Sequence, residues 1–212
     1  MHRLEIIPGL TLDEDLYAAA ADGLATHAPD QPALTWEAAT DPARWWLVPS
    51  PDDDDQGAPL PYKAEYVVTQ TLDLTVKVNI WHRPDLRRGE TSRPHNHPWD
   101  VMEAHPVLGG YEDMHWHRTA AGLLVDQGTA TNTPGSVNRI HARDYHEVVS
   151  IADPGRTVSV MVCGRWIHDE DRQGVWGHLN LDTGCHVSVQ RDPSEQDAFR
   201  ARLHKINPQH VS

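Results

Sequence analysis

The sequence predicts a mainly β protein, a sandwich or barrel of short strands with a helix near each end. From Tyr62 onward, apolar and polar residues alternate with period two, most clearly over residues 74–81. Turn signals such as Gly109-Gly110 and Pro134-Gly135 separate these runs at short intervals. Many short strands at close spacing are typical of sandwiches and barrels.

Helical periodicity is confined to the two ends of the chain. Near the N-terminus, Thr11 and Glu14 have the spacing of a capping box, and apolar residues recur every fourth position from 12 to 20. Gly23 is expected to end this helix. Near the C-terminus, Pro193 is expected in the first turn of a second helix that carries its apolar residues on one face.

The segments between the helices predict one β domain. Strand-like runs occupy residues 74–81, 101–108, 111–117, 123–126, 136–141, 147–151 and 157–163. The four aspartates and three prolines of residues 51–61 indicate a solvated loop before them. The expected organisation is therefore an N-terminal helical and loop extension over 1–61, a β-barrel over 62–182, and a C-terminal segment with a helix over 183–212.

Composition excludes several classes of partner. The chain has 212 residues and a net charge of -13, from 31 acidic and 18 basic residues. Nucleic acids and anionic membranes are not expected as partners, because binding them needs a basic face. No run approaches the roughly 20 apolar residues of a membrane span. The N-terminus lacks the basic-then-apolar layout of a signal peptide, so a cytoplasmic location is expected.

Histidine is the unusual residue of this chain. There are 15 in all, and eight fall between His82 and His146. Within this region, His95-Asn96-His97 places two imidazoles on the same side of an extended strand. Imidazole pairs held in this way are a common means of binding a divalent transition metal. We therefore expect a metal site here, with His146 as a third ligand from a later strand.

The spacing around these histidines resembles the cupin superfamily. Its first motif is G(X)5HXH(X)3–4E(X)6G, and Gly89, His95, His97, Glu103 and Gly110 occupy the matching positions. Five residues rather than three or four precede Glu103, so a bulge would be needed to bring its carboxylate to the metal.

The second cupin motif, G(X)5PXG(X)2H(X)3N, is matched less closely. Counted from Gly135, its histidine falls on His146, whereas His141, Arg143 and Ser150 replace the proline, the second glycine and the asparagine. The resemblance covers residues 62–182. It implies a double-stranded β-helix, the cupin or jelly-roll barrel, with a metal inside.

The resemblance also implies roles for the matching residues. One divalent metal ion is expected, Fe(II) first and Mn, Ni or Zn as alternatives, bound by His95, His97, His146 and Glu103. If Glu103 does not bind, a three-histidine site remains. His141, at the motif's proline position, is expected to line the pocket and to transfer protons, and Glu103 is the second catalytic candidate.

Further pocket residues are expected on strand faces that point into the barrel. Trp81 and Trp99 are expected as walls, and Lys77 and Arg139 as groups that bind a substrate carboxylate or phosphate. Strand parity alone leaves open whether these faces point inward or to solvent.

The expected function is that of a metal-dependent cupin enzyme. An Fe(II) oxygenase or dioxygenase that acts on a small amino acid or carboxylate with O2 is the first hypothesis. A non-redox isomerase, epimerase or lyase is the alternative, and a non-catalytic binding protein the third. Since cupins are often dimers, a homodimer is expected by analogy.

Overall fold

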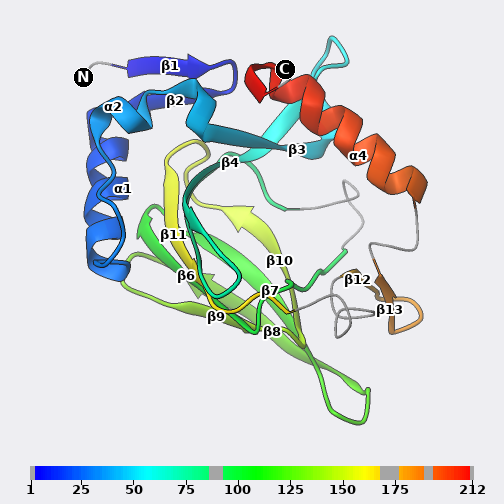
Figure 1. Ribbon diagram of the computed structural model, residues 1–212. Helices are drawn as coiled ribbons and strands as arrows, with labels where there is room; N and C mark the ends of the chain where they lie inside the picture. The colour runs from blue at the N-terminus through cyan, green and yellow to red at the C-terminus, as the bar shows by residue number, and fades with distance from the viewer. Residues whose placement is uncertain (1–2, 86–92, 168–176, 189–192, 211–212) are drawn as a thin grey trace.

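The protein is built around two antiparallel β-sheets (Figure 1). The computed structural model describes residues 3–85, 93–167, 177–188 and 193–210. Along the six-stranded sheet the strands follow the order β3 (Trp45–Asp53), β4 (Pro59–Gln70), β5 (Thr75–Trp81), β11 (Thr157–Cys163), β6 (Val101–Leu108) and β9 (Asn138–His141). The second sheet contains β10 (Asp144–Ile151), β7 (Tyr111–Arg118) and β8 (Leu124–Asn132).

A short extended segment between β5 and β6 enlarges the second sheet. His95 exchanges two backbone hydrogen bonds with His146 of β10, both of 2.9 Å. On its other side the segment meets β12 (Gly177–Asn180), because Leu179 donates to the carbonyl of Pro94 at 2.7 Å. β12 pairs in turn with β13 (Cys185–Ser188). The chain that carries His95 is therefore held between two strands.

The largest apolar core lies outside the barrel. Helix α1 (Glu14–His27), with the hairpin of β1 (Arg3–Ile7) and β2 (Leu10–Asp13), packs on the outer face of the six-stranded sheet (Figure 1). The sheet contributes alternate residues of its central strands to this core: Val76, Val78, Ile80, Val158 and Val160. Because side chains alternate along a strand, the residues between them point into the barrel.

The other helices in the described part of the chain lie toward the β3 edge of the same sheet. They are α2 (Trp36–Ala39), η1 (Pro42–Arg44), α4 (Pro193–Ile206) and η3 (Pro208–His210). The buried Asn207 fixes the end of α4 to β3, since it accepts from the Leu47 amide at 2.7 Å and donates to the Leu47 carbonyl at 2.8 Å.

The mainly β fold with helices at both ends is confirmed, but the first helix begins later than expected. Thr11 lies in β2, and Asp13 caps α1 by accepting a 2.9 Å hydrogen bond from Leu16. Gly23 does not end the helix, which continues to His27. A β-carbon at Gly23 would lie 2.6 Å from Val107 of β6, so glycine allows close approach of the helix to the sheet.

The six-stranded sheet also begins earlier than residue 62. Strand β3 pairs with β4 from Trp45↔Tyr66 to Asp53↔Pro59, although it lies within the expected extension. Gly89 of the first cupin motif lies outside the described residues.

Candidate metal centre

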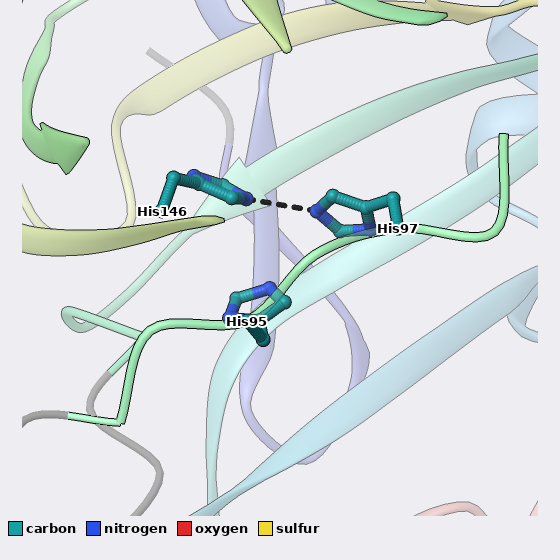
Figure 2. A group of neighbouring side chains, drawn as sticks. All are labelled: His95, His97 and His146. Atoms are coloured by element: carbon teal, nitrogen blue, oxygen red, sulfur yellow. Dashed lines mark hydrogen bonds between the residues drawn. The ribbon is translucent and has the colours of Figure 1, made fainter. Parts of the chain in front are cut away.

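Three histidines meet between the two sheets. His95 and His97 lie on the segment before β6, and His146 lies on β10. One ring nitrogen from each lies within 4.8 Å of the other two. His95 and His146 are buried, and His97 is partly exposed. Figure 2 shows His97 and His146 pointing toward each other, with His95 beside them.

Asp113 of β7 fixes the ring of His146. The Nδ1 of His146 lies 3.0 and 2.9 Å from the two carboxylate oxygens of Asp113, and Asn138 donates to the same carboxylate at 2.6 Å. Burial raises the pKa of Asp113, but His146 together with His115 and Asn138 outweighs it and holds the pKa below its usual value. The ionised carboxylate keeps the proton of His146 on Nδ1, which leaves Nε2 to face the cavity.

The donor set fits a divalent transition metal. Two nitrogens bound at right angles to one ion, each about 2.1 Å away, lie about 3 Å apart. The Nε2 atoms of His97 and His146 are 2.8 Å apart. Three imidazoles, one of them oriented by a buried carboxylate, suit iron, nickel, copper or zinc rather than calcium or magnesium. The three histidines thus form a group that could hold a metal ion.

The histidines line a small cavity between the sheets. Its volume is about 40 Å³, which is space for only a few water-sized groups. The residues that line it come from both sheets and from the connection after β5: Lys63, Trp81, Asp85, His95, His97, Met102, Ala104, Tyr111, Asn138, His146, Val148 and Met161.

No protein-family model and no curated protein sequence matches this chain. Several solved structures resemble it at low identity. KdgF from Halomonas sp. is 18% identical, with a TM-score of 0.36 over 56% of this chain and 89% of that one. Fe(II) HppE is 14% identical, with a TM-score of 0.36 over 54% of each chain. Oxalate decarboxylase from Lactobacillus farciminis is 12% identical, with a TM-score of 0.38 over 78% of this chain and 41% of that one.

The fold is a mainly β barrel built from antiparallel strands. Its two antiparallel sheets enclose the histidine group. Within the described ranges, no helix is both long enough and apolar enough to cross a membrane.

A row of charged side chains runs along the inner face of the barrel. Glu65 of β4 pairs with Lys63 at 2.8 Å and with Lys77 of β5 at 2.9 Å. Burial raises the pKa of Glu65, but the two ammonium groups outweigh it and lower the pKa to about 2. Burial lowers the pKa of Lys63, but the Glu65 carboxylate together with Tyr62 and Asp85 outweighs it and raises the pKa above its usual value. Both groups therefore stay charged at neutral pH.

Lys63, rather than the expected Lys77, reaches the cavity. The Nζ of Lys63 lies 5.3 Å from the ring of Tyr62 and 5.1 Å from that of Trp81, and its side chain lines the cavity. Lys77 is not among the lining residues, and its Nζ lies 5.6 Å from the Trp99 ring.

The two tryptophans expected as walls take different positions. Trp81 lines the cavity and donates to Ser159 at 3.0 Å. Trp99 stands behind the histidine group, with its ring 5.6 Å from His97 and 5.5 Å from Trp166. Trp99 therefore supports the ring of His97 and does not line the cavity.

Glu103 lies outside the histidine group, contrary to expectation. Met102 and Ala104 point into the cavity, so Glu103, between them on β6, points outward. The ladders that β6 forms with β9 and β11 run without a bulge across this position. On the outer face Glu103 accepts a 2.8 Å hydrogen bond from Arg139, whose side chain is 60% exposed. Arg139 is thus also outside the cavity.

His141 is also outside the cavity. Along β9, Asn138 and Ile140 are buried and the residues between and after them, Arg139 and His141, are exposed. The backbone amide of His141 donates to Asp144 at 2.8 Å. Strand alternation thus places Asn138, rather than His141, beside the histidine group.

Sequence analysis missed four polar residues of the site: Lys63, Asp85, Asp113 and Asn138. The alternation of side chains along a strand could have indicated two of them, Asp113 and Asn138. Asp113 shares a strand face with His115, and Asn138 shares one with Ile140. Nothing in the motif spacing marks Lys63 or Asp85.

Proposed function

We propose that this chain is a metal-dependent enzyme, a non-haem Fe(II) oxygenase that acts on a small carboxylate or amino acid. The observation that carries the proposal is the convergence of His95, His97 and His146 in a small cavity that also contains a buried cation, Lys63. Fe(II) bound by the imidazoles would supply redox chemistry with O2 and a Lewis-acidic anchor for the substrate.

The cavity favours a small anionic substrate. Only 8% of Lys63 is exposed, and its raised pKa keeps it positively charged. A volume of about 40 Å³ accommodates a carboxylate and little more. We therefore assign Lys63 the role of holding the substrate carboxylate, which sequence analysis had given to Lys77.

The other lining residues would orient the substrate and exclude water. Trp81 is held by its bond to Ser159 and presents a rigid apolar wall. Met102, Val148 and Met161 complete the apolar part of the lining. Asp113 keeps His146 in one tautomer and one orientation, so this ligand is already in place before metal or substrate arrives.

Metal content and oxygen dependence test the redox part of the proposal. The protein is purified anaerobically, its metal is identified, and O2 consumption is measured with a panel of small carboxylates and amino acids. We expect one iron per chain and substrate-dependent O2 uptake, both lost in His97→Ala. A redox-silent metal, with turnover unchanged when O2 is removed, would instead support the isomerase, epimerase or lyase alternative.

Replacement of Lys63 tests the substrate class. Lys63→Met is expected to raise KM for a carboxylate substrate by about tenfold or more, because a charged hydrogen-bond donor is lost. Arg139→Met is the matched control, since this cation lies on the outer face. An unchanged KM in Lys63→Met would contradict the anchoring role and leave the metal site unaffected.

A further inference from the structure

Asp85 is a buried carboxylate in the connection after β5. Its exposure is 3%, and its Oδ2 lies 3.4 Å from the Nε2 of His95, itself 2% exposed. Its backbone amide donates to the carbonyl of Val148 on β10 at 2.9 Å. The chain at Asp85 is thus fixed to the strand that also carries His146.

Within the described part of the chain, Asp85 is the acidic residue that lines the cavity with the three histidines. Glu103 points to the outer face. Asp113 directs both carboxylate oxygens at Nδ1 of His146. The carboxylate that the first cupin motif would supply from β6 therefore has a counterpart on a different segment.

The distance between the Asp85 carboxylate and the His95 ring is close to that between two adjacent ligands of one metal ion. Adjacent ligands about 2.1 Å from one ion lie about 3 Å apart. The Nε2 atoms of His97 and His146 are separated by 2.8 Å, and His95 Nε2 and Asp85 Oδ2 by 3.4 Å. Both pairs fall close to this spacing, and all four side chains border the same cavity. The Asp85 carboxylate lies outside the group whose ligand atoms are all within 4.8 Å of one another, so its side chain would have to turn toward the ion to bind it.

We propose that Asp85 supplies the carboxylate ligand of the metal centre, completing a set of three imidazoles and one carboxylate. This inference rests on the proposed metal-dependent function. It assigns the fourth ligand to the connection between β5 and β6 instead of to Glu103. A carboxylate among imidazoles shifts the preference of the site toward Fe(II) and Mn(II) and away from copper.

The ligand set also determines the net charge of the metal centre to which a substrate would bind. Asp85 lowers the net charge of a bound divalent ion from +2 to +1. The nearby ammonium group of Lys63 then becomes a second centre of positive charge in the cavity. A monoanion that bridges the ion and Lys63 is the substrate form that this arrangement favours.

The test is metal binding by the full-length apoprotein. Mn(II) and Co(II) are titrated by calorimetry, and the visible spectrum of the Co(II) form is recorded. We expect one ion per chain in the unaltered protein. Asp85→Asn is expected to weaken Mn(II) binding by more than about tenfold and to change the Co(II) spectrum, because an ionised ligand is lost.

Two variants separate this inference from the proposed function. Glu103→Gln is the matched control and should bind both ions like the unaltered protein. His97→Ala should lose binding, and if the unaltered protein itself binds no ion, the proposed function fails. If His97→Ala loses binding while Asp85→Asn keeps both the dissociation constant and the Co(II) spectrum, only the role of Asp85 is overturned.

A crystal structure of the unaltered protein loaded with Co(II) gives a readout that does not depend on whether Asp85→Asn folds. A carboxylate oxygen of Asp85 within about 2.2 Å of the ion supports the proposal. An oxygen that instead accepts a hydrogen bond from the His95 ring, without touching the ion, overturns it and makes Asp85 a positioning residue.

Discussion

Asp113 and His146 form a buried carboxylate–imidazole pair across β7 and β10, with Nδ1 2.9 Å from the nearer oxygen. Asp113 is fully buried, and its other contacts, to Asn138 at 2.6 Å and to His115 at 3.4 Å, place it at the centre of a polar network. The orientation of the His146 imidazole therefore depends on Asp113, whose two carboxylate oxygens face Nδ1 of that ring.

Replacing Asp113 should weaken metal binding. Asp113→Asn removes the charge that makes His146 a basic ligand, and we expect a loss of about 10- to 100-fold in metal affinity. Isothermal titration of the apoprotein measures it. Glu112→Gln, at the exposed neighbouring position, is the control and should bind normally. Equal affinity in Asp113→Asn would show that the pair does not tune the ligand.

The pH dependence of the unfolding free energy should contain a contribution from the ionisation of Glu65. Its pKa is about 2 in the folded chain and about 4.5 when unperturbed. Because the folded value is the lower one, its ionisation stabilises the fold fully above pH 4.5, and this contribution disappears as the pH falls toward 2. The difference in unfolding free energy between the unaltered protein and Glu65→Gln should therefore be largest near neutrality and shrink between pH 4.5 and 2.

Urea unfolding at several pH values measures this difference. Glu103→Gln, at a partly exposed position, should show no comparable pH-dependent difference from the unaltered protein. A Glu65→Gln difference that stays constant from pH 7 to 2 would contradict the buried pairing of Glu65 with its two lysines.

The approach of α1 to β6 should make Gly23 intolerant of a side chain. A β-carbon there would lie 2.6 Å from Cγ1 of Val107, so Gly23→Ala is expected to destabilise the fold by about 1–3 kcal/mol despite the better helix propensity of alanine. Removing the opposing methyl groups in Gly23→Ala/Val107→Ala should relieve the clash. Thermal or urea unfolding of the double-mutant cycle measures the coupling, and simple additivity would argue against this contact.

Glu103 should be dispensable for metal binding. Its partner Arg139 is largely exposed, and such pairs contribute about 0–1 kcal/mol. We expect Glu103→Ala to keep one metal ion per chain, measured by elemental analysis, and to change the unfolding free energy by less than about 1 kcal/mol. Loss of the metal with the fold intact would restore Glu103 as a ligand.

The histidines and most strands could be predicted because their signals are local. Two imidazoles at positions i and i+2 share a side of any extended segment, whatever the rest of the chain does. The same alternation shows why Glu103 lies outside the histidine group, contrary to expectation. Motif counting gave its position in the chain, whereas its two inward neighbours on β6 decide which face it occupies.

Lys63 and Asp85 could not be predicted because their positions depend on long-range register and chain path. Lys63 reaches the cavity because β4 pairs with β5 in the register Lys63↔Trp81. Asp85 does so because its amide is bound to Val148, which lies 63 positions later in the sequence. Neither relationship leaves a periodic pattern near the residue itself.

The apolar core beneath α1 and the polar interior of the barrel lie on opposite faces of the same sheet. Alternate residues of β5 and β11 therefore have different roles. One set packs in the apolar core beneath α1, and the other faces the interior of the barrel. Substitutions at inward positions that face the cavity directly would change its shape and charge while the apolar packing beneath α1 stays intact. The contents of the cavity and the largest core can therefore vary separately, although they share the same strands.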